Sequence, residues 1–514
     1  MGLFDRKPLE LLLEEMKGEH RLRRILGPIQ LTSLGIGAII GAGIFVATGA
    51  AAHNVGGPAL MLSYTVAGIT CVFAALCYAE FASMVPVAGS AYTYAYATMG
   101  ELFAWIIGWD LVLEYAVGSA TVATGWSGYF QNVLAKVGIV LPKTLQLSPW
   151  RFVQGHLEST GSLMNLPAIV IVTIITMILV KGIQESASFN AIMVAIKVAA
   201  VIFVIVVGAF YIDPANWHPF APYGWTGLNF FGHPIAGQQN AGGQPVGMLA
   251  GAAIIFFAYI GFDSVSTHTE EARNPQRDVP IGIVTSLIVC TVLYIAVVAV
   301  LTGMVKYDTL DINAPVSLAF KQKGIGWAEG LIAVAGAAGI TSVMLVMMLS
   351  GPRVFLAMAR DGLVSRKFFG DVHPKFRTPW KSTILIGSGV VLAAGFLPLE
   401  FLLLLTNIGT LFAFAIVCTA VLIMRKKYPN AERPFRCPWV PFVPIMGVLC
   451  CLMLMFSLPW ENWWRLFLWM GIGLVIYFSY GRKHSVMSVN LAKEIAEHGA
   501  GGAYTSGTRE TPAS

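Results

Sequence analysis

Apolar stretches of 18 residues or more recur along the whole chain, and they constrain its fold more than any other feature. In lipid an unpaired backbone N–H or C=O is so costly that a spanning segment must be a helix or part of a closed barrel, and a helix needs about 20 apolar residues. Of the 514 residues, 56% are hydrophobic and 12% are charged. An ordinary soluble protein has about 25% charged residues. The sequence therefore predicts an all-α integral membrane protein.

Twelve such stretches can be counted, and the polar residues gather between them. Their approximate bounds are 29–49, 57–84, 101–131, 166–184, 188–211, 247–268, 280–304, 327–351, 382–397, 400–424, 439–458 and 463–481. The segment 1–28 before them is polar and basic, so no cleavable signal peptide is expected. Leu9, Leu12, Leu13 and Met16 follow helical spacing there. This spacing predicts an amphipathic helix, either on the inner leaflet or on the protein's own cytoplasmic face.

The distribution of Lys and Arg predicts the orientation of the chain. If the N-terminus is inside, the inside segments hold 25 of the 33 basic residues. Cytoplasmic loops carry such an excess, so both termini are expected in the cytoplasm of a multi-pass cell-membrane protein. The tail 482–514 ends in a Gly-, Thr- and Ser-rich stretch that is expected to be disordered.

Several functional classes find no support in the sequence. The seven cysteines lie in spans or in a cytoplasmic loop, and the nine histidines are scattered, so neither a disulfide framework nor a metal site is expected. No nucleophile or acid–base cluster suggests an enzyme, and nothing calls for a cofactor. The formal charge of +6 reflects the inner loops and does not point to nucleic acid. No span shows the polar stripe that a channel would need.

Glycine interrupts two of the apolar stretches at related places in the two halves of the chain. The first is 36–45 (IGAIIGAGIF), and the second is 254–263 (IIFFAYIGFD). Glycine destabilises a helix and frees backbone groups, which is tolerated at membrane depth only beside a cavity. Paired breaks in the two halves point to the binding site of a secondary transporter. A small-residue face for helix packing is the alternative for the first break.

The first break offers groups that suit a carboxylate. Gly41 and Gly43 are two residues apart, so they cannot both serve one helix face. The amides of Ala42, Gly43 and Ile44 would start the second half-helix, and such an end binds anions. The carbonyls of Ile39 and Ile40 would accept hydrogen bonds from an ammonium group.

The second break supplies the complementary groups. The freed carbonyls would complete an ammonium site, and the aromatic side chains Phe257, Tyr259 and Phe262 would cover the ligand, unless they serve core packing alone. The predicted carbonyls belong to Phe256, Phe257, Ala258 and Ile260. A zwitterionic ligand, of which an amino acid is the simplest, fits this chemistry.

Ionisable residues within spans are functional candidates by default. Lys197 lies deep in its span, and desolvation would let it gain and lose a proton; a structural lysine paired with carbonyls or a carboxylate is the alternative. Glu114 lies mid-span and is the expected carboxylate partner. Ser342, with Thr341, could coordinate an ion or the lysine, or bond its own helix. Asp263 would anchor helix ends or bind a ligand.

Four motifs carry a resemblance to a known family. They are 35–45 (GIGAIIGAGIF), 78–92 (YAEFASMVPVAGSAY), 262–277 (FDSVSTHTEEARNPQR) and 352–362 (PRVFLAMARDG). In this order over about residues 25–480, they resemble the amino acid–polyamine–organocation superfamily, and most closely its cationic amino acid transporters. With twelve spans where the eukaryotic members have fourteen, the chain looks like a prokaryotic homologue.

The resemblance implies a fold and a site. Two inverted five-helix repeats would occupy 29–211 and 247–424, with two extra helices in 439–481 and helices 1 and 6 unwound mid-membrane. The substrate carboxylate would bind at Gly41 to Ile44, and its ammonium near Ile40 and Phe257. Proton-coupled relatives have a lysine at the place where sodium-coupled relatives hold an ion, and Lys197 matches that lysine.

The substrate expectation depends on Met347, near which the eukaryotic cationic carriers have a small residue. Unless it faces lipid or another helix, its side chain would fill the space of a long cationic arm. We therefore expect a proton-coupled symporter for a small neutral L-amino acid such as alanine, as a monomer or small assembly in the bilayer, with arginine as a possible cationic substrate. An amino acid or polyamine exchanger and a non-transporting receptor are the alternatives.

Overall fold

A computed structural model describes most of the chain. The described residues are 26–84, 90–153, 156–182, 187–231, 233–267, 269, 272–312, 314–376 and 378–486. The amphipathic helix predicted within 1–28 and the end of the tail 482–514 lie outside these residues.

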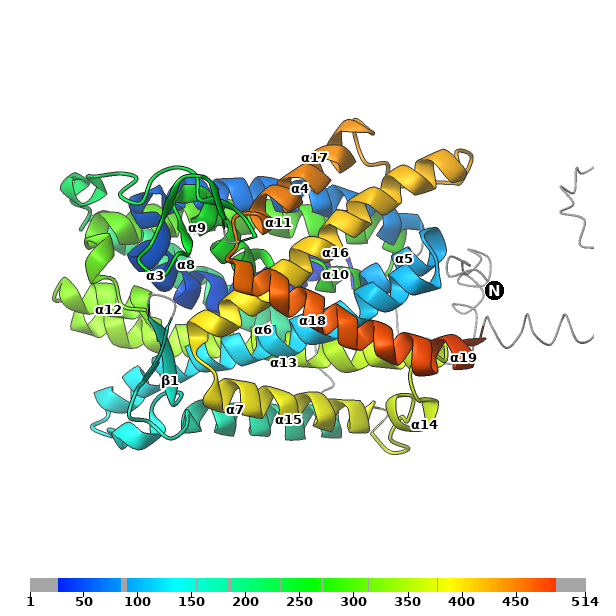
Figure 1. Ribbon diagram of the computed structural model, residues 1–514. Coiled ribbons are helices and arrows are strands. Elements are labelled where there is room, and N and C mark those ends of the chain that lie inside the picture. The colour runs from blue at the N-terminus through cyan, green and yellow to red at the C-terminus, as the bar shows by residue number, and fades with distance from the viewer. Residues whose placement is uncertain are drawn as a thin grey trace, which may run out of the picture.

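Helices make up most of the described structure (Figure 1). The first half contains α2 (Pro28–Ile39), α3 (Thr48–Ala51), α4 (Leu60–Met84), α5 (Ser90–Thr98), α6 (Glu101–Lys136), α7 (Leu166–Lys181) and α8 (Ala187–Ala209). Short π- and 3-10-helical turns join the early ones: η1 (Gly43–Ala47), η2 (Ala52–Gly56) and η3 (Gly57–Ala59).

The second half continues in the same way. Its α-helices are α9 (Met248–Ile255), α10 (Ser264–Thr267), α11 (Pro275–Met304), α12 (Pro315–Gln322), α13 (Gly326–Arg360), α14 (Arg366–Phe369), α15 (Trp380–Phe396), α16 (Leu399–Lys427), α17 (Phe442–Met455), α18 (Trp460–Ile476) and α19 (Arg482–His484). The turns η6 (Phe256–Tyr259), η8 (Tyr307–Thr309) and η9 (Tyr477–Gly481) lie between them.

The connecting loops carry three small antiparallel hairpins and two further turns. These are β1 (Trp150–Val153) with β2 (His156–Ser159), β3 (Leu228–Phe230) with β4 (His233–Ala236), β5 (Gln238–Gln239) with β6 (Pro245–Val246), η4 (Lys143–Leu145) and η5 (Pro214–Trp217). They follow α6 and α8, the two places where the sequence has long polar loops.

Local sequence signals explain several helix boundaries. Proline occupies one of the first two positions of α2, α7, α11 and α12, where its missing N–H costs no helical bond. The Asn165 side chain accepts a hydrogen bond from the Ala168 amide and caps α7. Gly182 ends α7 with φ 84°, a left-handed conformation that glycine adopts without strain.

Every predicted apolar stretch overlaps helical structure, but the number of evident spans is smaller than twelve. By length and composition, seven helical segments of the described residues can cross a membrane, or eight if α17 and α18, bent by 112°, form one span. One segment, Pro28–Met84, runs through two of the predicted stretches. The apolar helices α7 and α15 have only 16 and 17 residues, short of the roughly 20 that a span needs.

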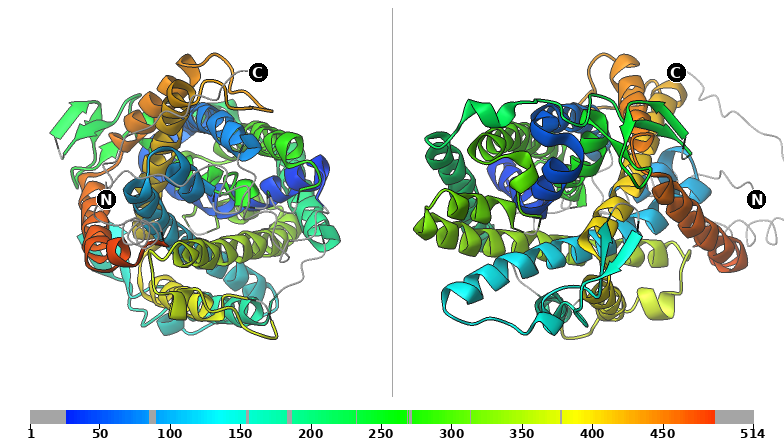
Figure 2. Two further views of the ribbon diagram at one scale, coloured as in Figure 1. Left: turned by 90° about the vertical axis from the view of Figure 1, so that its right-hand side faces the viewer. Right: turned by 60° about the vertical axis from the view of Figure 1, so that its left-hand side comes forward.

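The long helices α6 and α13 run side by side through the molecule, and α7 packs against α15 (Figure 1). The helix α11, from the second half of the chain, packs against both α2 and α4 from the first. Figure 2 shows these early helices, in blue, among green helices of the second half. The two glycine-interrupted segments are thereby brought together inside one helical body.

Candidate substrate and coupling site

The two interrupted segments meet at their breaks. A Cβ atom added to Gly43 would overlap the backbone and side chain of Ala258, and one added to Gly261 would lie 2.8 Å from the Ala38 carbonyl oxygen. Gly261 also has φ 122°, in the left-handed region that disfavours other residues. Each segment therefore uses a glycine to approach an alanine of the other, so the crossing requires both glycines.

The first segment leaves helical geometry at Ile40. The helix α2 ends at Ile39, Ile40 is extended with φ −70° and ψ 104°, and η1 begins at Gly43. The Phe45 amide donates to the Gly41 carbonyl at 3.1 Å. In the described part of the chain, the amides of residues 42–44 donate no backbone hydrogen bond outside the helices. Amides at the start of a helical segment lack helical acceptors and suit an anionic group.

The second segment is interrupted in a different way. The helix α9 ends at Ile255, the turn η6 follows, and Ile260 is extended with φ −59° and ψ 130°. The Asn407 side chain in α16 donates to the carbonyls of Ala253 and Ile254 at 2.9 and 2.7 Å. This amide supplies donors where the broken helix lacks them. Sequence reasoning missed Asn407, although a polar side chain in an apolar span is a recognisable signal.

Tyrosine hydroxyls from other helices bind the carbonyls at the crossing. The Tyr294 hydroxyl in α11 lies 2.7 Å from the Ile39 oxygen and 3.2 Å from the Ala258 oxygen, so it bridges the two breaks. These are two of the carbonyls predicted to bind a ligand's ammonium. The hydroxyl has one hydrogen and a carbonyl oxygen has two lone pairs, so the hydroxyl donates to one carbonyl at a time and each carbonyl can still accept from a ligand.

A second tyrosine network holds the segment after the first break. The Tyr64 hydroxyl lies 2.7 Å from the Thr48 hydroxyl and donates to the Gly43 carbonyl at 3.2 Å. The Tyr259 hydroxyl donates to the Tyr64 carbonyl at 2.8 Å. Tyr259, predicted to cover a ligand, thus belongs to a network that fixes the geometry of the break. Tyr64, Thr48 and Tyr294 were not identified from the sequence, since single hydroxyls in spans give no distinctive pattern.

Aromatic residues of the second break pack against other rings inside the protein. The Phe256 ring lies 5.7 Å from that of Phe414, and the Phe262 ring lies 5.0 Å from the same ring. Phe257 is buried and lies in η6, which contacts η1 at the crossing. Phe257 is also the neighbour in sequence of Ala258, on which Gly43 of the first break packs.

Lys197 lies beside the first break. Its side chain has no exposed surface, and its ammonium nitrogen donates to the Gly37 carbonyl in α2 at 2.6 Å. A Cβ atom added to Gly339 in α13 would lie 3.1 Å from the Lys197 Cγ. The Ser342 hydroxyl donates to the Gly339 carbonyl at 3.1 Å, which places Ser342 one turn from the lysine. Lys197, which belongs to α8, therefore connects the end of α2 to α13.

Glu114 does not serve as the carboxylate partner of Lys197 that the sequence predicted. The charged groups that act on Glu114 are Asp263 and Asp110, which are also carboxylates. Neither Glu114 oxygen makes a hydrogen bond among the described residues. The Thr410 hydroxyl, which faces Glu114, donates instead to the Thr406 carbonyl at 3.3 Å. Sequence position alone could not show which side of α6 Glu114 occupies relative to α8.

Asp263 anchors the end of the second break. Its carboxylate accepts hydrogen bonds from the Tyr115 hydroxyl at 2.8 Å and the Gly261 amide at 3.2 Å. The side chain is fully buried. These two bonds hold the glycine turn and connect it to α6, which agrees with the anchoring alternative for Asp263.

Met347 faces another helix within the protein. It is buried, and its sulfur would lie 3.2 Å from a Cβ atom added to Gly118 in α6. The Thr406 methyl lies 3.8 Å from the same position. Met347 thus fills space between α13 and α6 that Gly118 leaves open.

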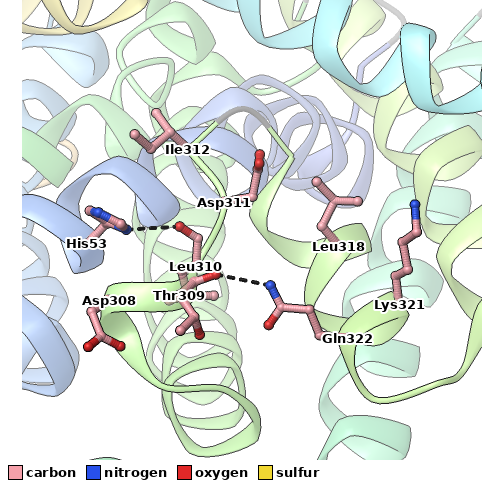
Figure 3. A pocket seen from close by; sticks show the side chains of 9 residues that line it. All are labelled: His53, Asp308, Thr309, Leu310, Asp311, Ile312, Leu318, Lys321 and Gln322. Atoms are coloured by element: carbon pink, nitrogen blue, oxygen red, sulfur yellow. Dashed lines mark hydrogen bonds between the residues drawn. The ribbon is translucent and has the colours of Figure 1, made fainter.

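A separate cavity of about 470 Å³ lies between η2, η8 and α12 (Figure 3). His53 contacts the Leu310 carbonyl at 3.1 Å, and Gln322 donates to the Thr309 carbonyl at 3.0 Å across its wall. Asp308, Asp311 and Lys321 give it a mixed charge. None of the residues selected from the sequence lines this cavity.

Comparisons with known proteins identify the family of the chain. The amino acid permease family matches residues 26–477. The branched-chain amino acid permease BcaP of Bacillus subtilis is 46% identical over 95% of this chain and 99% of its own length. The methylthioribose transporter of the same organism is 44% identical over the same shares.

More distant relatives include the human cationic amino acid transporter 4, which is 35% identical over 80% of this chain and 61% of its own length. These proteins are permeases and transporters rather than enzymes. The chain therefore belongs to the amino acid permease family of the amino acid–polyamine–organocation superfamily.

Proposed function

We propose that the protein is a proton-coupled symporter of a small neutral L-amino acid that works by alternating access. The observation that carries the proposal is the crossing of two interrupted segments, where Gly43 packs on Ala258 and Gly261 on Ala38. Interrupted helices that cross inside a helical membrane protein provide backbone groups for a polar substrate. Membership of the amino acid permease family supports an amino acid as that substrate.

The substrate would bind mainly through the backbone. Its carboxylate would accept hydrogen bonds from the amides of Ala42, Gly43 and Ile44. In the described part of the chain, these amides donate no backbone hydrogen bond outside the helices. Its ammonium would donate to carbonyls near Ile40 and Phe257. Because the carbonyls of Ile39 and Ala258 already face the Tyr294 hydroxyl, this tyrosine would adjust when the ammonium arrives.

Lys197 would couple protonation to the conformational change. As an ammonium it makes a charge-assisted hydrogen bond to the Gly37 carbonyl, only three residues before Ile40. Such bonds are about twice as strong as neutral ones, so loss of the proton would weaken the link between α8 and the first break. A ligand or proton shifts a conformational equilibrium only by its different affinity for the two states. Lys197 provides such a difference at the break itself.

Glu114 and Ser342 would contribute to coupling from different places. Ser342 bonds to Gly339, which contacts the Lys197 side chain, so it would affect the lysine through α13. Glu114 acts within a separate group of carboxylates, together with Asp263 and Asp110. A proton bound there would reduce like-charge repulsion beside the second break. The two halves of the site would therefore each have a titratable group.

The proposal of a short substrate side chain rests on the family resemblance at Met347, near which the cationic carriers have a small residue. Because Met347 packs beside Gly118 of α6, it would limit the substrate through the contact between α13 and α6 rather than by facing the ligand. The relatives carry different names, for branched-chain amino acids, methylthioribose and cationic amino acids. Family membership alone therefore does not determine the substrate. An exchanger of amino acids or polyamines, and a receptor that binds without transport, remain the alternatives.

The membrane arrangement is part of the same proposal. The twelve apolar stretches would each cross the bilayer, with 29–211 and 247–424 as inverted repeats, 439–481 as two extra helices and both breaks at mid-membrane. The excess of Lys and Arg in the inner loops supports cytoplasmic termini. The protein would act as a monomer or small assembly.

Counterflow in liposomes tests this function. Vesicles that contain the purified protein and unlabelled alanine should accumulate labelled alanine from outside, and arginine should compete weakly. An inward proton gradient should accelerate net uptake, whereas a sodium gradient should not. Binding without counterflow would favour a receptor, exchange without net uptake would favour an exchanger, and sodium dependence would contradict proton coupling.

A further inference from the structure

A second cavity, of about 460 Å³, opens between α6, α13, α15 and α18. Its lining includes none of the residues that form the crossing. Its walls are almost wholly apolar and include Val112, Phe355, Leu385 and Ile386. The only hydroxyl-bearing residues that line it are Ser365 and Tyr480. We call this cavity the α18 groove.

One wall of the α18 groove is a rigid tryptophan pair. The Trp109 indole N–H donates to the Trp469 carbonyl at 3.0 Å, and the Trp469 indole N–H donates to the Trp109 carbonyl at 3.1 Å. Their rings stack with centroids 4.5 Å apart. Because both polar N–H groups are satisfied by the partner's backbone, this wall offers no hydrogen bond to the groove. Water needs about three such partners in a buried site, so an apolar occupant is favoured.

Basic residues follow Ser365 and Tyr480, two lining residues of the α18 groove, closely in the sequence. Exposed Lys367 follows Ser365 by two residues, and exposed Lys483 follows Tyr480 by three. Figure 1 shows α14 and α19, which carry these lysines, at the same end of the molecule. Arg366 and Arg482 lie on the same two helices, Arg360 ends α13, and Lys381 lies in the first turn of α15. An anion at this end would therefore meet several cations.

The nearby carboxylates already have partners. Asp371 forms an ion pair with Lys381 at 2.7 Å, and Asp361 accepts a hydrogen bond from the Tyr92 hydroxyl at 2.6 Å. Glu101 is buried and accepts from the hydroxyls of Tyr477 and Ser485. Hydrogen bonds from hydroxyls leave the negative charges of Asp361 and Glu101 in place. With Asp371, three negative charges stand against the six positive charges of the basic residues named above, so this end of the groove stays cationic.

We propose that the α18 groove is a binding site for one anionic phospholipid. An acyl chain would lie along the tryptophan pair, and the phosphate would contact Lys367, Lys483 and the Ser365 hydroxyl. A dry apolar groove that ends in lysines matches the two parts of such a lipid. A partner's transmembrane helix would fill the apolar walls but would not use the lysines, and a zwitterionic phospholipid would gain less from them.

Occupancy would also stabilise the C-terminal end of the described chain. Tyr480 lines the groove, and Tyr477, three residues earlier, donates to Glu101 at the start of α6 at 3.0 Å. A lipid that holds η9 in place would therefore strengthen its contact with α6. The readout follows from linkage, because a ligand that binds only the folded state raises the melting temperature.

The experiment compares two lipids on the full-length protein. The protein is reconstituted in phosphatidylcholine nanodiscs with increasing phosphatidylglycerol, and the melting temperature is measured together with native mass spectrometry of retained lipid. We expect phosphatidylglycerol to raise the melting temperature in a saturable way and one molecule to remain bound. Equal stabilisation by phosphatidylcholine alone, or a co-purified polypeptide that occupies the groove instead, would overturn the proposal.

Two variants assign the effect to the groove. The double reversal Lys367→Glu/Lys483→Glu should weaken the phosphatidylglycerol effect by about tenfold or more, since each basic residue near an anionic surface contributes about 1 kcal/mol. The matched reversal Lys426→Glu/Lys427→Glu, on exposed residues of α16, should leave it unchanged. Leu385→Trp should block the groove, whereas Leu392→Trp on the same helix should not. Equal effects of test and control variants would refute the site.

Discussion

The two interrupted segments reach the same crossing by different means. The first break depends on missing side chains: Gly43 packs directly on Ala258, and the amides that follow Gly41 lack recorded acceptors outside the helices in the described structure. At the second break, the side chains of Asn407 and Tyr294 bind carbonyls. Tyrosine hydroxyls also bind carbonyls of the first break, but its amides stay available to an anionic group of a ligand. The comparison suggests that the first segment binds and the second supports.

The largest effect is expected from a side chain at the first break. Gly43→Ala places a methyl group within the backbone of Ala258, so substrate binding should be lost and stability should fall by about 1–3 kcal/mol, as for overpacked cores. Gly330→Ala in α13, where a Cβ meets nothing within 4 Å, is the control. Binding is measured by calorimetry and stability by thermal unfolding. Retained binding in Gly43→Ala would show that the crossing is not the site.

A large effect is also expected from the lysine that joins the first break to α8. Lys197→Met keeps the apolar stem but removes the donor to the Gly37 carbonyl. Proton-driven uptake should fall to background and the pH response should disappear, while the protein stays folded. Lys181→Met, at the exposed end of α7, should leave uptake unchanged. An unchanged pH response in Lys197→Met would exclude Lys197 from coupling.

The second break should be sensitive to its supporting side chain rather than to its own backbone. Asn407→Ala leaves the carbonyls of Ala253 and Ile254 without their side-chain donor. A buried polar group without a partner costs about 1–3 kcal/mol, so the melting temperature should fall and affinity should weaken. Thr419→Val in the same helix, whose hydroxyl bonds its own turn, should have a much smaller effect. Equal effects of both would contradict a supporting role for Asn407.

A change in selectivity is expected from the methionine between α13 and α6. Met347→Ser opens space beside Gly118 and should admit longer or cationic amino acids, at a stability cost of about 2–4 kcal/mol for the lost buried side chain. The equally buried Met348→Ser should cost stability without changing selectivity. Competition assays in liposomes measure the preference. If wild-type protein already prefers arginine to alanine, Met347 does not set the substrate.

The smallest effect is a coupling energy that should be close to zero. Glu114 acts with Asp263 and Asp110 and not with Lys197, so Glu114→Gln and Lys197→Met should have additive effects on thermal stability. Sites that share no partner usually add within about 0.5 kcal/mol. A double-mutant cycle measures this term. A larger coupling would indicate a conformation in which the two residues meet.

Much of the arrangement could be predicted from individual residues. The glycines of the first break, the deep lysine and the apolar stretches each have a pattern with a direct physical meaning. Lys197 was selected for its depth in an apolar stretch, and the structure places it near the first break. Asn407, Tyr294 and Tyr64 could not be found this way, because their importance comes from which carbonyl they reach across the fold. The predicted pairing of Glu114 with Lys197 was wrong because it, too, depends on how helices face one another across the fold.

The sequence by itself determined the helical membrane class, the two places where helices are interrupted and the depth of Lys197. These follow from local rules, since hydrophobic length and glycine content act within one segment. Only the tertiary structure decided that Gly43 meets Ala258, that Asn407 and Tyr294 satisfy the second break, and that Glu114 lies among carboxylates. These contacts join residues far apart in the chain, and their partners depend on how helices rotate and pack, which no single segment specifies.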